Sequence, residues 1–276
     1  MSLIKQIFHT TFQKSEFDSL TFRQSQGGKK FDFKVLLICT LACLSLVMIE
    51  YIGKEPGYRV FIGFLRSIRW NSFANLLTDK LDKSPDQQLN RLAYWVCCIM
   101  VFYFILPVVL VKAVFREKIR DYGFQIGSAF KDYRIYIFML LIMIPIVYLF
   151  SRTQSFQERY PFYSLKSGES LYPNFWTWQI MYFIQFIGVE FFFRGFIVHG
   201  LKKRFGFYSI IIMTIPYCMI HFGKPMPEAI AAIFAGLILG TLSMKSNSIW
   251  LGIAIHYSVA ITMDLSALWQ KGLIFH

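Results

Sequence analysis

Six candidate residues with ionisable side chains stand inside otherwise apolar stretches of the C-terminal third of the chain. They are Glu190, Arg194, His221, Glu228, His256 and Asp264. Burying a charged group among apolar side chains is costly, so such residues are kept for a structural or a chemical reason. A carboxylate, a guanidinium and two imidazoles are groups that hydrolytic sites use. We therefore place the candidate site in this part of the chain.

Glu190 and Arg194 are four residues apart in an apolar, aromatic stretch. On a helix this spacing puts both side chains on one face, about 6 Å apart along the axis. The guanidinium would then neutralise and orient the carboxylate in a setting of low dielectric constant. A structural ion pair without chemistry is the alternative interpretation of this spacing.

His221 and His256 stand on separate apolar segments, and Glu190 stands on a third. In one arrangement the carboxylate is a general base toward water, and the imidazole N–H groups stabilise an oxyanion. In another, Glu190, His221 and His256 bind Zn²⁺ and leave its fourth position open for water. The spacing of the residues does not separate these two arrangements.

Glu228 and Asp264 are accessory candidates. Glu228 follows Pro225 and Pro227, which fits the first turn of a helix, where proline is tolerated and an acidic residue is favoured. Asp264 comes eight residues after His256, which places it about 80° around a helix from the histidine. It either lines the same cavity or marks the end of the segment.

Four motif pieces occur in order on separate apolar segments between residues 176 and 265. They are Glu190 with Arg194 and Gly195, Tyr217 with His221, Phe234 with Gly236 and Gly240, and finally His256. Together they resemble the CPBP family, the CAAX-protease and bacteriocin-processing intramembrane proteases related to the type II CAAX prenyl endopeptidase. The pairing of Gly236 with Gly240 also allows close helix packing in a membrane.

The resemblance implies an intramembrane endopeptidase that hydrolyses a peptide bond of a membrane-associated protein or peptide. Glu190 would activate water, Arg194 would hold Glu190, and the two histidines would polarise the scissile carbonyl or bind zinc. Two positions depart from the family pattern. Val189 stands where the family usually has the first of two glutamates, and Ala260 stands where an asparagine is common. A catalytically inactive scaffold that binds partner proteins is therefore the alternative function.

The elements that must position these residues are membrane-spanning helices. Hydrophobic residues make up 55% of the 276 residues and charged residues only 16%, against about 25% charged in soluble domains. The apolar runs approach the ~20 residues that cross a bilayer. They cover residues 35–52, 92–111, 135–150, 175–201, 208–222, 228–244 and 248–265. We predict an all-α, polytopic membrane helix bundle of about seven to eight spans.

Three regions follow along the chain. Residues 1–32 form a polar N-terminal extension, residues 33–150 hold the first spans, and residues 175–265 form the CPBP-like bundle. Between the first two spans, apolar residues recur near helical spacing over 61–77 while arginines occupy other faces. This pattern predicts an amphipathic helix at the membrane surface.

The net charge of +13 arises from basic residues beside the apolar runs. Lipid headgroups account for such clusters better than nucleic acid, for which no recognition motif is present. With a cytoplasmic N-terminus, 16 basic residues lie on the cytoplasmic side and 12 on the other side, which favours this orientation. We expect a multi-pass protein of the bacterial inner membrane whose partners are lipids and a membrane-associated substrate.

Overall fold

The computed structural model describes residues 3–25, 31–126, 128–165 and 168–274, and these form helices and connecting turns without a strand. The helices are α1 (Leu3–Ser25), α2 (Phe33–Met48), α3 (Tyr58–Ser67), α4 (Asn71–Thr78), α5 (Gln87–Ile99), α6 (Leu106–Val109), α7 (Tyr133–Phe150), α8 (Gln154–Arg159), α9 (Asn174–Glu190), α10 (Gly200–Phe205), α11 (Tyr208–Met219), α12 (Met226–Ser246) and α13 (Trp250–Gln270). π-helical turns extend α2 as Ile49–Gly53, continue α5 toward α6 as Met100–Ile105, and join α9 to α10 as Phe191–His199.

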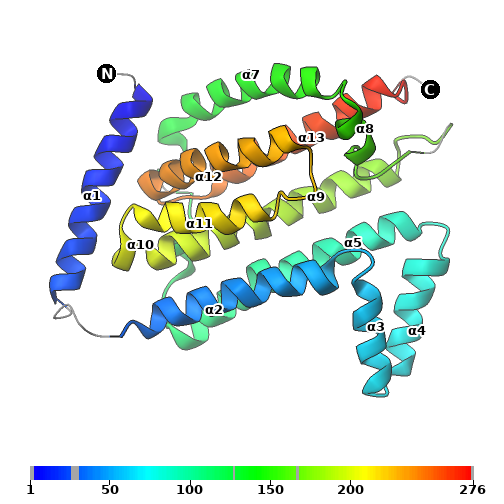
Figure 1. Ribbon diagram of the computed structural model, residues 1–276, viewed down its shortest axis with the longest axis horizontal. Helices are drawn as coiled ribbons and strands as arrows, with labels where there is room; N and C mark the ends of the chain where they lie inside the picture. The colour runs from blue at the N-terminus through cyan, green and yellow to red at the C-terminus, as the bar shows by residue number, and fades with distance from the viewer. Residues whose placement is uncertain (1–2, 26–30, 127, 166–167, 275–276) are drawn as a thin grey trace.

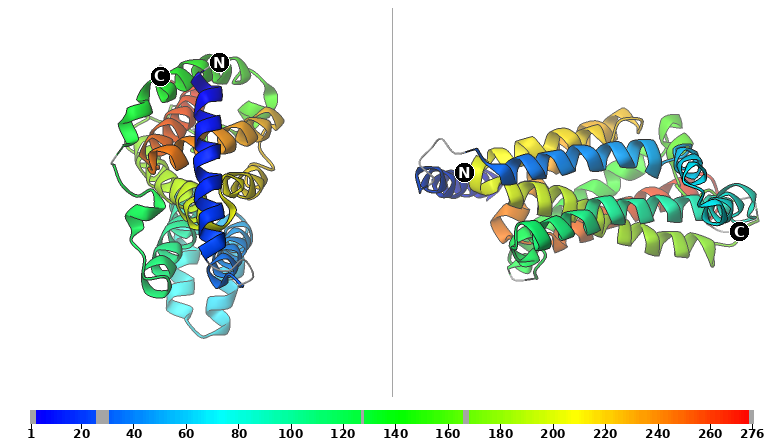
Figure 2. Two further views of the ribbon diagram at one scale, coloured as in Figure 1. Left: turned by 90° about the vertical axis from the view of Figure 1, so that its left-hand side faces the viewer. Right: turned by 90° about the horizontal axis from the view of Figure 1, so that it is seen from below.

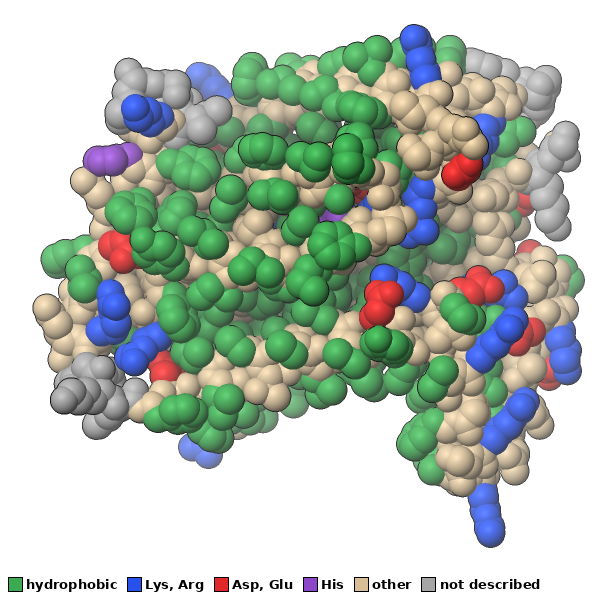
Figure 3. Space-filling model, in the orientation of Figure 1, with side chains coloured by type: hydrophobic (Ala, Val, Ile, Leu, Met, Phe, Trp, Pro, Cys, Tyr) green, Lys and Arg blue, Asp and Glu red, His purple; other side chains and the backbone are tan. Residues whose placement is uncertain are grey.

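Within the described residues, six continuous helices are long and apolar enough to cross a membrane. They are Phe33–Gly53, Gln87–Val114, Phe130–Phe150, Asn174–Phe205, Met226–Ser246 and Trp250–Gln270. A shorter apolar helix, α11, runs beside them (Figure 1). Figure 3 shows hydrophobic side chains across the middle of one face and charged side chains gathered toward its two ends. The chain is an integral multi-pass membrane protein, and the predicted all-α bundle is confirmed.

The span Asn174–Phe205 is the central helix of the bundle. In its most apolar stretch of 18 residues, 72% of the stretch is buried inside the protein. The corresponding share is 17–44% in the other five spans. The main hydrophobic core joins this helix to residues of the earlier spans, such as Ile38 and Tyr103, and of the later ones, such as Ile253. The helix that carries Glu190 and Arg194 is therefore surrounded by protein rather than by lipid.

Two helical segments lie across the ends of the spans (Figures 1 and 2). α1 crosses one end and packs against α10. At the other end, α3 and α4 project sideways as a hairpin below α2 and α5. We predicted one amphipathic helix over 61–77, but the structure has two. Arg69 adopts the left-handed conformation with φ of 63°, which L-residues other than glycine rarely adopt, and so the chain turns there.

α11 is short for a membrane-spanning helix. Its 12 residues rise about 18 Å, whereas the 21 residues of α12 rise about 32 Å. The turn from α11 to α12 therefore lies short of the ends of α9 and α13 (Figure 1). His221 and Lys224 stand on this turn. Their polar groups therefore lie closer to the middle of the bundle than the ends of α9 and α13 do.

Candidate functional site

Glu190 and Arg194 form a fully buried ion pair on the central helix. The Arg194 Nη1 donates to Glu190 Oε1 at 2.9 Å, and neither side chain is exposed. The second guanidinium nitrogen, Nη2, donates to the carbonyl of Ala235 on α12 at 3.4 Å. Glu190 Oε2 and Arg194 Nε have no hydrogen-bond partner. The predicted pair on one helix face is present, and it ties the central helix to α12.

His256 on α13 reaches the same carboxylate. Its Nδ1 lies 2.8 Å from Glu190 Oε1, and its ring lies 4.4 Å from the ring of Phe186. One turn earlier on α13, Gly252 leaves room for the carboxylate: a Cβ at this position would lie 2.7 Å from Glu190 Oε2. The absence of a side chain at Gly252 therefore lets α13 approach α9 closely enough for the histidine to meet the glutamate.

Tyr217 lies between the two histidines. The His221 Nδ1 lies 2.8 Å from the backbone carbonyl of Tyr217, and the Tyr217 hydroxyl lies 3.4 Å from the Nε2 of His256. The Arg194 guanidinium stacks 4.0 Å from the centre of the Tyr217 ring. The four residues Glu190, Arg194, His221 and His256 are thus joined by direct contacts through one tyrosine.

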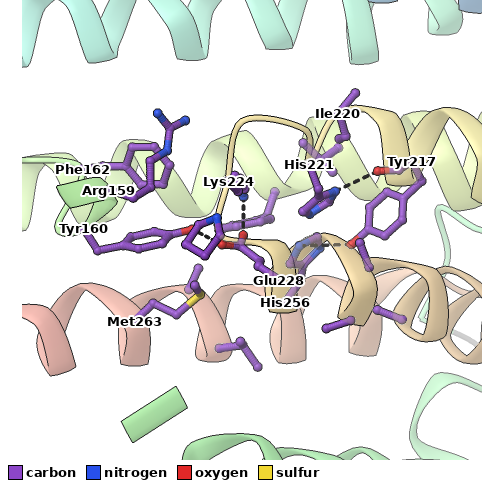
Figure 4. A pocket seen from close by; sticks show the side chains of 18 of the residues that line it. Arg159, Tyr160, Phe162, Tyr217, Ile220, His221, Lys224, Glu228, His256 and Met263 are labelled. Carbon is purple, nitrogen blue, oxygen red and sulfur yellow. Dashed lines mark hydrogen bonds and ion pairs between the residues drawn. The ribbon is translucent and has the colours of Figure 1, made fainter. Parts of the chain in front are cut away.

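A cavity of about 500 Å³ opens beside these residues. His221, His256 and Val189 line it, whereas Glu190 is not among its lining residues. Adjacent helix residues point about 100° apart, so when Val189 faces the cavity Glu190 faces Arg194 and His256. Figure 4 shows the rings of His221 and His256 near each other, on the same side of the Tyr217 ring. The histidines, and not the glutamate, are the groups of this set that meet the cavity.

Glu228 brings a second carboxylate to the cavity wall. It accepts hydrogen bonds from Lys224 Nζ at 2.6 Å and from the Tyr160 hydroxyl at 2.8 Å. Both partners also line the cavity, together with Arg159 (Figure 4). The helix-start interpretation also agrees with the structure, since Glu228 lies in the first turn of α12.

Asp264 is fully buried and does not line the cavity. Its Oδ2 accepts hydrogen bonds from Trp178 Nε1 at 3.0 Å and Gln179 Nε2 at 2.9 Å. Its Oδ1 accepts from the backbone N–H of Phe162 at 3.1 Å. Asp264 therefore fastens α9 and the segment after α8 to α13, and this segment supplies Phe162 to the cavity wall.

The zinc arrangement with Glu190, His221 and His256 does not fit this geometry. In residues 3–25, 31–126, 128–165 and 168–274, no three His, Cys, Asp or Glu side chains gather as a metal-binding group. The one Glu190 oxygen near His256 faces its Nδ1, and the same oxygen accepts from Arg194. Glu190 and His256 could bind zinc together only if the contacts of Glu190 Oε1 with Arg194 and His256 were broken.

The hydrogen bonds fix the tautomer of each neutral histidine. A carboxylate and a backbone carbonyl only accept hydrogen bonds, so Nδ1 carries the proton in both His256 and His221. Each Nε2 then offers a lone pair. The sequence had suggested imidazole N–H donors for an oxyanion, whereas this arrangement provides two proton acceptors beside the cavity.

Three cavity residues had no role in the sequence-based prediction of the site. Tyr217 belongs to a recognised motif piece, which is the signal that could have identified it. Lys224 stands three residues after His221 in a short turn, and Tyr160 lies in a polar, aromatic loop 61 residues earlier. The sequence contains no pattern that connects Tyr160 to Glu228, because their contact depends on how the loop packs.

Residues 171–262 match the family model described as type II CAAX prenyl endopeptidase Rce1-like. No curated protein and no solved structure matches the chain. The matched segment includes every motif residue discussed above, and it supports an intramembrane protease function of the CAAX type. Residues 171–262 of this membrane protein are therefore similar to the Rce1-like type II CAAX prenyl endopeptidases, which confirms the resemblance to the CPBP family.

Proposed function

We propose that the protein is an intramembrane endopeptidase in which His256 activates the attacking water. The observation that carries this proposal is the contact between Glu190 and His256 Nδ1 at 2.8 Å, with the other side of the imidazole at the cavity. A carboxylate in this position holds the ring in one tautomer and stabilises the imidazolium that forms on proton uptake. Glu190 is then a positioning residue, since it has no exposed surface and touches no substrate.

The reaction follows from the two lone pairs. A water molecule donates one hydrogen bond to His256 Nε2 and one to His221 Nε2, taking the place of the Tyr217 hydroxyl. His256 removes a proton as the water oxygen attacks the carbonyl carbon of the scissile peptide bond. The C–N bond then breaks, and the imidazolium returns the proton to the leaving nitrogen. Lys224, which lines the cavity close to His221, supplies an ammonium group that stabilises the oxyanion.

The shape of the cavity favours a membrane-associated protein or peptide as the substrate. Most of its wall is apolar, and it includes Phe222 and Phe234, which are 65% and 62% exposed. Figure 3 shows a histidine side chain between hydrophobic side chains in the middle of this face. An apolar segment of a substrate could therefore reach the histidines from the lipid. Lipids are the other expected partner, and we expect no binding of nucleic acid.

We further propose a bacterial inner membrane location with a cytoplasmic N-terminus, as the distribution of basic residues favours. The cavity polar groups Glu50, Lys54, Arg159 and Lys224 then lie toward the non-cytoplasmic side. This follows because α2 runs from the end near α1 toward the hairpin end (Figure 1). Water would enter the site from that side.

A cleavage assay in proteoliposomes tests the proposed function. Wild type, Glu190→Gln, His221→Ala and His256→Ala would be incubated with a panel of apolar membrane-associated peptides. We expect cleavage by the wild type and a loss of about 10²–10⁴-fold in the His256 variant, the usual range for removal of a general base. Cleavage by His256→Ala at the wild-type rate would exclude His256 as the base.

A catalytically inactive, partner-binding scaffold is the second candidate function. It is favoured by one observation: Val189, at the position of the usual first glutamate, lines the cavity. The substitution Val189→Glu discriminates the two functions. A scaffold that lacks only this carboxylate would cleave nothing as wild type and would gain cleavage in the variant.

A further inference from the structure

The hairpin of α3 and α4 lies at the ends of the spans that contain α2 and α5 (Figure 1). It begins after the span that ends at Gly53 and finishes before the span that begins at Gln87, and both figures of the ribbon show it projecting sideways from the bundle (Figures 1 and 2). A small core of its own holds the two helices together, formed by Tyr58, Ile62, Leu65, Ala74 and Leu81.

The surface of the hairpin away from this core is strongly apolar. Six large hydrophobic side chains are 43–65% exposed: Val60, Phe64, Ile68, Trp70, Phe73 and Leu76. At 100° per residue, Val60, Phe64 and Ile68 form one stripe along α3. Arg59 and Arg66 fall on a second stripe about 150° away from the first. Apolar and basic side chains therefore point in nearly opposite directions, as on a helix at a membrane surface.

The basic groups near the tip have no acidic partners within the described part of the chain. Arg66 and Arg69 are exposed and form none of the ion pairs of the structure. The acidic residues lie at the base of the hairpin instead. Asp82 accepts a hydrogen bond from the Tyr58 hydroxyl at 2.5 Å, and this hydrogen bond holds the pKa of Asp82 below its usual value. The base is thus neutralised within the protein, whereas the tip carries free positive charge.

We infer that the hairpin is a docking element for anionic phospholipid headgroups. Its apolar stripe enters the acyl-chain boundary of the bilayer, Trp70 lies at the interface as tryptophan commonly does, and Arg66 and Arg69 meet headgroup phosphates. Charge complementarity and the position of the hairpin at the ends of α2 and α5 select lipid as the occupant. This inference is independent of whether the cavity catalyses a reaction.

Hydrogen exchange in nanodiscs tests the inference with the full chain. The protein would be reconstituted in phosphatidylcholine alone and in phosphatidylcholine mixed with phosphatidylglycerol. Peptides from residues 58–78 should exchange more slowly in the anionic bilayer, by roughly fivefold for each basic residue that meets the surface. The ratio of the exchange rates in the two bilayers should be smaller in Arg66→Gln/Arg69→Gln, by up to about 25-fold. Unchanged exchange of α13 in this variant would show that the fold is intact.

A matched variant controls for the loss of charge. Arg116→Gln/Arg120→Gln removes the same charge at the opposite end of the spans, and Arg116, like Arg69, has a positive φ. This variant should leave the lipid dependence of the hairpin unchanged. Equal exchange of residues 58–78 in both bilayers would overturn the inference. So would protection that depends on protein density but not on lipid charge, because a second copy would then be the occupant.

Discussion

Replacement of Glu190 by glutamine separates the positioning role of this residue from direct catalysis. The substitution keeps the size of the side chain but removes the charge that faces Arg194 and His256, at 2.9 and 2.8 Å. Arg194 is fully buried and has no other carboxylate within reach in the described residues. Removing one member of a buried ion pair costs about 3–5 kcal/mol, so the variant should unfold at a lower temperature.

Glu190→Gln should lower the cleavage rate because it impairs His256 as the general base. An amide in place of the carboxylate no longer stabilises the imidazolium, so we expect cleavage per folded molecule to fall by about 10²–10⁴-fold. If Glu190 acts only through His256, the double variant Glu190→Gln/His256→Ala should be no slower than His256→Ala alone. Non-additivity of this kind marks residues that act as one unit.

The assay is single-turnover cleavage in proteoliposomes, with the rate divided by the folded fraction measured on the same sample. Glu117→Gln is the control, because it removes a carboxylate that pairs with Lys34 at 2.6 Å away from the cavity. Its rate should match that of the wild type. Independent, multiplicative losses from Glu190→Gln and His256→Ala would refute the reasoning, since Glu190 would then contribute without the histidine.

Three further predictions concern the surroundings of this pair. Gly252→Ala should lower cleavage at least tenfold, because its Cβ would lie 2.7 Å from Glu190 Oε2, whereas Gly63→Ala meets no atom within 4 Å and should leave the cleavage rate unchanged. Asp264→Asn should lower the free energy of unfolding by about 2–3 kcal/mol, measured by denaturation in detergent, because an amide nitrogen would face one of three hydrogen-bond donors. Incubation with a chelator should leave cleavage unchanged, since the described residues form no metal-binding group; inactivation that zinc reverses would contradict this.

The sequence predicted the membrane helices and the contact between Glu190 and Arg194 better than the directions in which side chains face. Apolar runs identify spans because each must cover the hydrocarbon thickness. The i,i+4 spacing predicted the contact between Glu190 and Arg194 because a helix imposes it locally. Which of Val189 and Glu190 faces the cavity depends on how α9 is rotated against its neighbours, and no local pattern records this rotation.

Long-range packing also decided the features that the sequence did not predict. Asp264 was a candidate for the cavity, yet it binds Phe162 and Trp178, which are 102 and 86 residues away in the chain. The hairpin was predicted as a single helix because its apolar spacing continues through the turn at Arg69. Only the packing of α3 against α4 around Leu65 and Ala74 distinguishes the two.

The most direct test of the central claim is hydrolysis in water enriched in oxygen-18. Wild type and His256→Gln would be reconstituted with the peptide panel, and the products analysed by mass spectrometry. The proposed function predicts that the wild type releases fragments with one oxygen-18 atom in each new carboxylate, and that His256→Gln releases essentially none. A folded wild-type protein that yields no labelled fragment from any peptide, or a His256→Gln variant that yields as many as the wild type, would contradict it.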